Sequence, residues 1–149
     1  MSKISILGTG GWGIALGIHA FSLGHTVKMW SPFKEEVDML LVKRENENLL
    51  KGVKLPEEIV LTNQISDVLG SDITILAVPS FAVRSTAKLL SGTDCGIVVN
   101  VAKGFEKGTL LRLSEVIKQE LPDKKIVVLS GPSHAEEVAR AVPTTVVSA

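Results

Sequence analysis

Cysteine is almost absent from this sequence, since Cys95 is the only one among 149 residues. A lone cysteine cannot form a disulfide framework within the chain, so we expect a reducing compartment, the cytoplasm. Long hydrophobic runs are absent as well. The apolar run near the N-terminus, Ile4–Leu7, is too short for the core of a signal peptide, and no stretch reaches the roughly 20 apolar residues of a membrane-spanning helix. We therefore expect no membrane association.

An excess of charge is also lacking, because 16 basic and 16 acidic side chains give a formal net charge of zero. A balanced charge provides no general attraction to nucleic acid or to an anionic membrane surface, so neither is expected as a partner. The sequence has no internal repeat and no low-complexity segment. Hydrophobic residues are abundant at 45%, and in a chain of this length they suffice for one domain with its own buried core.

Short apolar runs rich in β-branched residues alternate with segments of helical period. The predicted strands are Ile4–Leu7, Thr26–Trp30, Ile59–Thr62, Ile73–Val78, Gly96–Val101, Ile126–Leu129 and Thr144–Ser148. The predicted helices are Trp12–Leu23, Lys34–Arg44, Gln64–Leu69, Phe81–Leu90, Leu110–Glu120 and Ser133–Arg140. Because nearly every residue of these strands is apolar, we predict a Rossmann-like, doubly wound α/β fold: a mostly parallel sheet with helices on both faces.

Three features mark the ends of these segments. Gly24 stands where a glycine commonly follows the last turn of a helix. Pro122 is expected to stop the helix that begins near Thr109. The chain ends in TTVVSA, within or just after a predicted strand and without a polar tail, so we expect it to be part of a longer protein.

Residues 8–13, GTGGWG, match the pattern G-x-G-x-x-G between a predicted strand and a predicted helix. Gly8 permits the tight turn out of the strand, Gly10 lets a diphosphate approach the main chain, and Gly13 lets the helix pack close to the strand. The amides at the start of the helix would face the diphosphate, and the main-chain amide of Trp12 lies in this turn. The pattern predicts dinucleotide binding.

The end of the second strand normally carries the residue that contacts the adenosine ribose, and an acid there favours NAD. Here the sequence is VKMWSPFKEE, with no carboxylate before Glu35. Lys28 and Lys34 are the nearby cations, and both are interpreted as solvated surface residues. The choice between NAD and NADP stays open, and the missing acid argues against a strict preference for NAD.

Two further stretches follow predicted strands, at the edge where ligands of parallel sheets bind. In AVPS (residues 77–80), Pro79 is either the border of this crevice or an ordinary proline at the end of a strand. In NVAKGFEKG (residues 100–108), Lys103 stands directly before Gly104. An ammonium group there can donate to a phosphate or carbonyl oxygen, and the glycine leaves room for a substrate. A lone loop lysine can equally be a solvated surface residue.

The stretch LSGPSHAEEVAR (residues 129–140) follows the sixth predicted strand. Ser133 and Glu136 have the spacing of a capping box, which predicts that Ser133 caps the helix. The same geometry would direct free backbone amides towards whatever lies above Gly131 and Ser133. His134 could carry a proton, but without a visible partner it is interpreted as a surface residue.

Together these stretches resemble one family, the bacterial-type NAD(P)-dependent glycerol-3-phosphate dehydrogenases. The matching segments are GTGGWG at 8–13, VKMW at 27–30, AVPS at 77–80, AKG at 102–104 and LSGPSHAEEVA at 129–139. The resemblance runs along the whole chain. It implies the nucleotide-binding domain of an oxidoreductase that interconverts sn-glycerol 3-phosphate and dihydroxyacetone phosphate for phospholipid synthesis. Members of the family carry an additional helical C-terminal domain, and a homodimer is plausible for the full-length enzyme.

The resemblance also implies roles for individual residues. With the fingerprint glycines, the residues expected to bind NAD or NADP are Gly8, Gly10, Gly11, Trp12, Gly13, Pro32, Phe33, Pro79, Lys103 and Ala135. The residues expected to bind the substrate are Lys103, Gly131 and Ser133, and no metal is implied. The general acid/base of the family is a lysine in the helical domain, so residues 1–149 are expected to bind nucleotide but to be essentially inactive. The chain departs from the family at Gly11, which often is serine, and at Pro32 and Phe33, where a basic residue or histidine is common. It also departs at Leu49 and Lys51, which usually are tyrosine and proline.

Alternative hypotheses share the glycine fingerprint but not every other motif. Another two-domain dehydrogenase, of the hydroxyacyl-CoA or ketopantoate-reductase type, is not expected to carry LSGPSHAEEVA. A non-catalytic module that senses NAD(H) would need neither Lys103 nor Ser133. A flavodoxin-like domain would have no dinucleotide site at all.

Overall fold

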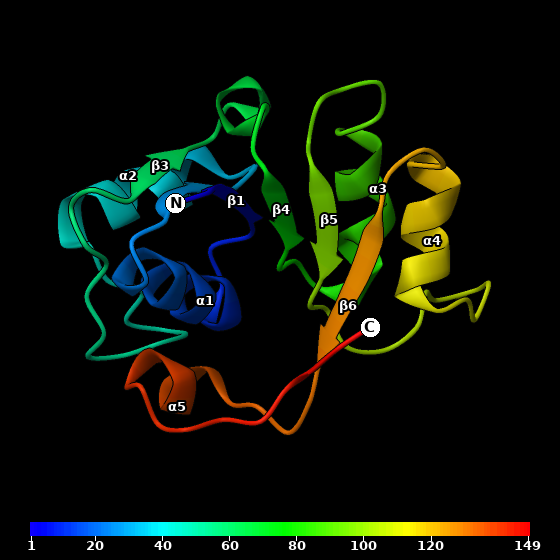
Figure 1. Ribbon diagram of the computed structural model, residues 1–149. Coiled ribbons are helices and arrows are strands. Elements are labelled where there is room, and N and C mark those ends of the chain that lie inside the picture. Colours follow the sequence, from blue (N-terminus) through cyan, green and yellow to red (C-terminus); the bar gives the residue numbers. More distant parts are fainter.

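The computed structural model describes all 149 residues, which form a seven-stranded sheet flanked by helices (Figure 1). The strands are β1 (Lys3–Leu7), β2 (Thr26–Trp30), β3 (Val60–Thr62), β4 (Ile73–Leu76), β5 (Ile97–Asn100), β6 (Ile126–Ser130) and β7 (Val147–Ser148). They are ordered β3-β2-β1-β4-β5-β6-β7. All neighbours among the first six strands are parallel. The sheet therefore reverses its winding direction between β1 and β4, which confirms the predicted doubly wound fold.

The helices divide between the two faces of this sheet. They are α1 (Gly11–Ser22), α2 (Lys34–Lys43), α3 (Val83–Lys88), α4 (Leu113–Glu120) and α5 (Ala135–Ala139), with short 3₁₀-helices η1 (Ile65–Val68) and η2 (Ser80–Ala82). Helices α1 and α5 pack together on one side, and α3 packs against α4 on the other (Figure 1). No helix is both long enough and apolar enough to cross a membrane.

The core has two parts, one on each face of the sheet, because successive side chains of a strand point to opposite sides. Ile6 of β1 is fully buried in one cluster together with Ile14 of α1. The next residue, Leu7, is fully buried in the other cluster with Leu76 and Ile117. Burial on both faces explains why the strands read as continuous apolar runs rather than alternating ones.

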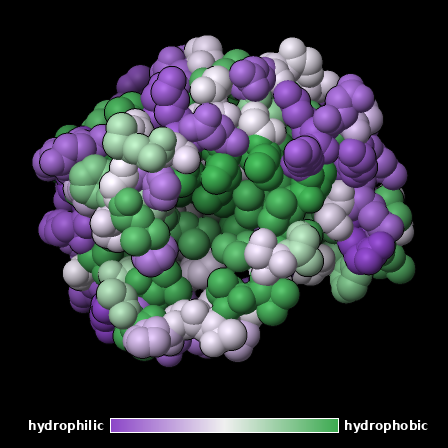
Figure 2. All heavy atoms as spheres, viewed as in Figure 1, coloured by the Kyte–Doolittle hydropathy of each residue, from purple (hydrophilic) through white to green (hydrophobic).

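One part of the sheet has no helical cover. On the side of α1, Ile97 and Val99 of β5 and Val127 of β6 keep part of their surface exposed. Figure 2 shows this region as a hollow with hydrophobic walls in the middle of the face. The helices thus cover β1 to β3 on this side, whereas α3 and α4 cover the central strands on the other side.

Four predicted helices have different bounds, including Ser133–Arg140, of which only Ala135–Ala139 is helical. Residues 64–69 form only the single 3₁₀ turn η1, because the chain turns at Gly70, whose φ is +72°. The segment from Phe81 is divided between η2 and α3. Leu110 has a φ of +58°, in the left-handed region, so α4 starts at Leu113 rather than near Thr109.

Other predicted ends agree with the structure. Gly24 follows α1 with a φ of +84°, and its N–H donates to the carbonyl of Phe21. Helix α4 ends at Glu120, two residues before Pro122. The last strand is shorter than predicted and antiparallel to β6. A parallel pairing would require the chain to cross back over the sheet, and the five residues of α5 followed by Pro143 do not provide that crossover.

Candidate dinucleotide site

The glycines of the β1–α1 loop serve two different purposes. Gly8 has a φ of +123°, and a Cβ atom there would lie 2.3 Å from the carbonyl oxygen of Ala77. A Cβ at Gly13 would lie 2.3 Å from the carbonyl oxygen of Gly8. These two glycines therefore allow β1, β4 and α1 to approach closely. A Cβ at Gly10, in contrast, would meet no atom within 4 Å, so the main chain there faces open space.

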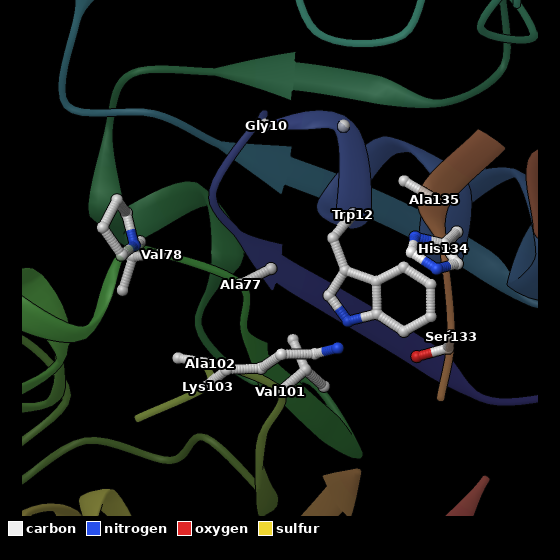
Figure 3. Close-up of a pocket in the computed structure, with 12 residues that line it drawn as sticks. Gly10, Trp12, Ala77, Val78, Val101, Ala102, Lys103, Ser133, His134 and Ala135 are labelled. Atoms are coloured by element: carbon white, nitrogen blue, oxygen red, sulfur yellow. The ribbon is translucent and has the colours of Figure 1, made fainter. Parts of the chain in front are cut away.

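A cavity of about 360 Å³ lies in front of this loop, at the carboxyl ends of the central strands. Its lining residues come from the β1–α1 loop, the ends of β4 and β5, and the segment before α5: Gly10, Gly11, Trp12, Ala77, Val78, Pro79, Val101, Ala102, Lys103, Ser133, His134 and Ala135. We call it the central cavity. Figure 3 shows the side chains of Lys103 and Ser133 extending towards the space beside the Trp12 indole, from the segments that follow β5 and β6. The structure thus brings Trp12 and Ser133, which are 121 positions apart in the sequence, to one rim.

A second cavity of about 550 Å³ extends from the same loop across the end of β2. We call it the outer cavity. It shares Gly10, Ala77, Val78 and Pro79 with the central cavity. The other residues that line it are Gly8, Thr9, Trp30, Ser31, Pro32, Phe33, Glu36, Leu49, Phe81, Ala82, Ser85, Thr86 and Leu89. Most of these side chains are apolar or small. Two connected cavities that meet at Gly10 form an elongated crevice at the switch point of the sheet.

Most of the predicted site residues line these two cavities, but two have other surroundings. Gly13 lies under the loop and lines neither cavity. Gly131 contributes with Lys103 to a separate opening beside Arg112. A Cβ at Gly131 would lie 2.8 Å from the carbonyl oxygen of Thr145, so this glycine also permits close packing of the C-terminal segment.

The predicted capping box at the start of α5 is wrong. The residue that precedes the helix is His134, with extended φ and ψ of −111° and 137°, and no side chain caps the helix. Since the cap position lies one residue later than expected, Glu136 is not at the third helical position, and its bond to Ser133 does not form. The hydroxyl of Ser133 instead donates a long 3.5 Å bond to the carbonyl of Gly131. His134 is exposed, as predicted, but it also lines the central cavity.

Thr9 and the contacts of the loop at residues 45–52 were not predicted from the sequence. Thr9 is 2% exposed, yet its hydroxyl has no hydrogen-bond partner within the chain. Asn46 donates to the carbonyl of Thr9 at 3.4 Å, and the carbonyl oxygen of Leu49 lies 2.7 Å from the Cβ position of Gly11. A serine at position 11 would collide with this loop, which explains the glycine. No spacing rule could have indicated this contact.

A partly buried ion-pair network joins the loop that carries Lys103 to two helices. The guanidinium of Arg84, on α3, donates two bonds to Glu106, of 2.6 and 2.9 Å, and one of 2.6 Å to Glu120 at the end of α4. Hydrogen bonds from Arg84, and then from Thr109, lower the pKa of Glu106 to about 2. Bonds to the two carboxylates raise the pKa of Arg84 above its ordinary value. The network ties α3, α4 and the β5–α4 loop together beside the central cavity.

The residues present fit a bound dinucleotide. The first N–H groups of α1 have no partner within the helix and lie next to the open main chain of Gly10, as a diphosphate requires. Thr9, the residue between Gly8 and Gly10, also lines the outer cavity. The fold, the switch-point crevice and this loop define a dinucleotide-binding domain of the Rossmann class.

The comparison with known proteins narrows this class to one family. Residues 3–149 match the family described as NAD-dependent glycerol-3-phosphate dehydrogenase N-terminus. A glycerol-3-phosphate dehydrogenase [NAD(P)+] of Fusobacterium nucleatum is 47% identical over 152 residues, and one of Clostridium perfringens is 44% identical over 151. Each match covers 99% of this chain but only 45% and 46% of the relative. The chain belongs to this family and spans about half the length of the curated relatives it matches.

The fold agrees with a solved member. The crystal structure of glycerol-3-phosphate dehydrogenase from Coxiella burnetii superposes with a TM-score of 0.89 at 32% identity. The match covers 97% of this chain and 45% of the solved one. The domain described here therefore has the arrangement seen in a glycerol-3-phosphate dehydrogenase.

Proposed function

We propose that this chain is the nucleotide-binding part of an NAD(P)-dependent oxidoreductase that interconverts sn-glycerol 3-phosphate and dihydroxyacetone phosphate. The observation that carries this proposal is the central cavity, where Gly10, Lys103 and Ser133 share one rim at the switch point of the sheet. The relatives named above support the choice of reaction, because their names state it. The glycerol 3-phosphate formed would supply phospholipid synthesis in the cytoplasm.

The two cavities suggest how the cofactor is held. The main chain at Gly10 and the start of α1 would bind the diphosphate. The outer cavity, with Pro32 and Phe33 at its edge, would take the adenosine, and the central cavity would take the nicotinamide end. When bound, the nicotinamide ring gives or accepts the hydride. We assign Trp12 and Ala135 to the walls of the nicotinamide end.

Lys103 and Ser133 would position the reacting carbonyl compound. The ammonium of Lys103 offers donors for a carbonyl or phosphate oxygen, and Gly104 beside it leaves space. The hydroxyl of Ser133 is held only by one long bond and is free to turn towards a ligand. A proton must still be delivered to the carbonyl oxygen, and we assign that task to a lysine outside this chain. Such a group contributes about 10²–10⁴-fold to the rate.

A titration of this chain with NADH, followed by tryptophan fluorescence, tests the proposal. Lys103→Met removes the ammonium but keeps the length of the side chain. Losing a charge-assisted hydrogen bond should weaken the affinity about tenfold or more, either for NADH or for dihydroxyacetone phosphate in the presence of NADH. The control is Lys107→Met, because Lys107 is exposed and lines neither cavity. Unchanged binding in Lys103→Met would favour a nucleotide-sensing module instead.

The same preparation tests whether proton transfer requires a group outside these 149 residues. The 149 residues alone should bind NADH without oxidising it measurably when dihydroxyacetone phosphate is added. Substantial turnover would show that the groups described here suffice for proton transfer, and would contradict our assignment of that step to another part of the enzyme.

A further inference from the structure

The outer cavity carries negative charge only. Glu36 is the only residue with an ionisable side chain among those that line it. The remaining lining residues are glycines, hydroxyl-bearing residues and apolar side chains. Any charged group of a ligand that enters this cavity therefore meets a carboxylate and no cation.

The carboxylate of Glu36 is held at the cavity wall by the end of β2. Glu36 lies in the first turn of α2 and is half-buried, whereas its neighbour Glu35 is exposed. The hydroxyl of Ser31, which is 2% exposed, donates to one oxygen of Glu36 at 2.5 Å and accepts a 3.3 Å bond from the N–H of Phe33. The second carboxylate oxygen of Glu36 makes no hydrogen bond within the chain, so it remains available to accept one from a ligand.

The two lysines around the end of β2, Lys28 and Lys34, make contacts outside the outer cavity. The ammonium of Lys34 pairs with Asp38 at 2.6 Å along the exposed side of α2. The ammonium of Lys28 donates to the carbonyl of Asp67 at 2.7 Å. Neither lysine lines the outer cavity. The interpretation of both as surface residues agrees with these contacts.

The end of the second strand carries no acid, but the helix that follows it places Glu36 at the wall of the same cavity. Building on the proposed function, we propose that Glu36 selects NAD(H) over NADP(H). Its free oxygen accepts a hydrogen bond from a ribose hydroxyl, whereas a 2′-phosphate, with about two negative charges, is repelled.

Parallel titrations with NADH and NADPH, monitored by the tryptophan fluorescence of the chain, test this inference. We expect the unmodified chain to bind NADH at least tenfold more tightly than NADPH. Glu36→Gln keeps an oxygen that accepts the bond from Ser31 but removes the charge, so NADPH affinity should rise about tenfold and the preference should largely disappear. Glu35→Gln is the matched control and should leave the preference unchanged.

Two further measurements test whether the preference for NADH arises at the adenosine end of the ligand and from charge repulsion. ADP-ribose and its 2′-phosphate should reproduce the same preference, because they carry the adenosine end without the nicotinamide. Raising the salt concentration should reduce the preference of the unmodified chain and have little effect on Glu36→Gln, since salt screens charge repulsion at a partly exposed site.

The outcomes separate this inference from the proposed function. Equal binding of NADH and NADPH, or a preference that Glu36→Gln does not change, would contradict the role of Glu36 and leave the dinucleotide site intact. Failure of both dinucleotides to bind would contradict the proposed function and the inference with it. Thermal unfolding of each variant establishes that a loss of binding does not reflect a loss of the fold.

Discussion

At the scale of single residues, two glycines of the β1–α1 loop, three positions apart, have opposite roles. Gly10 has open space where its side chain would be, whereas Gly13 has the backbone of Gly8 there at 2.3 Å. A side chain at position 10 is therefore compatible with the folded chain and obstructs only a ligand. A side chain at position 13 is incompatible with the packing of α1 on β1 and β4.

Gly10→Val should abolish NADH binding while the melting temperature in the absence of ligand changes little. The valine side chain would occupy the space in front of the main chain that we assign to the diphosphate. Isothermal titration calorimetry measures the binding, and differential scanning calorimetry measures the stability. Retained NADH affinity in a folded Gly10→Val variant would place the diphosphate elsewhere.

Gly13→Val is the contrasting variant. It should destabilise the fold, by about 1–3 kcal/mol or more, because the new side chain forces the helix away from the strand. Its effect should appear in the melting temperature without ligand, which distinguishes it from Gly10→Val. Equal stability of the two variants would contradict the division of roles among these glycines.

The sequence predicts residues of the site where a main-chain requirement sets them. Gly8 and Gly10 follow from the fingerprint, whereas the role of Lys103 follows from the family resemblance, because its place after a strand also fits a solvated surface lysine. Thr9 and Glu36 could not be found this way, because the direction of a side chain depends on the path of the loop around it. For Glu36, the available signal was an acid in the first turn of the helix after β2.

At the scale of elements, the Arg84 network joins three segments that are remote in sequence. Arg84 and its partners Glu106 and Glu120 have side chains that are 34%, 15% and 21% exposed. The Lys34–Asp38 pair, in contrast, has side chains that are 71% and 54% exposed, and pairs of that kind contribute little. We therefore expect the Arg84 network to hold the β5–α4 loop, which carries Lys103, against α3 and α4.

Arg84→Gln should destabilise the chain in a pH-dependent manner. The pKa of Glu106 is lowered from its ordinary 4.5 to about 2 in the folded state, so its stabilising effect is fully present above about pH 4.5. That effect is lost as the pH falls from 4.5 towards 2. The difference in melting temperature between the unmodified chain and Arg84→Gln should therefore be large at pH 6 and smaller at pH 3.

The control for this prediction is Lys34→Gln, which removes one positive charge from the exposed pair with Asp38. It should lower the melting temperature very little at either pH. A difference for Arg84→Gln that stays constant between pH 6 and pH 3 would show that the packing of Arg84, rather than its charge, supports the loop.

The long elements were predictable from the sequence and the short ones were not. Strand β2 and helix α1 have patterns long enough that tertiary contacts reinforce them. Segments η1 and α5 have four and five residues, and a single turn has little helical preference of its own. Their bounds are decided by neighbouring turns, such as the left-handed Gly70, and by how the chain meets the rest of the sheet.

At the scale of the whole molecule, the crevice joins the two halves of the sheet. The central and outer cavities are lined by loops that follow β1, β2, β4, β5 and β6. The continuous apolar runs of the strands predict the two-sided core, and the doubly wound order places these five loops on one edge. A ligand in the crevice therefore contacts both core clusters through their loops, and global unfolding must release it.

NADH should consequently raise the melting temperature of the entire domain in one transition. A ligand at one hundred times its dissociation constant adds about 2.7 kcal/mol to the stability of the native state. For a domain of this size that corresponds to a rise of roughly 5–11 °C. Differential scanning calorimetry at increasing NADH concentrations measures the rise. Gly10→Val should show none of it, because its fold is kept and its site is blocked. Two separate transitions, with only one of them shifted by NADH, would mean that the ligand contacts one half of the sheet alone.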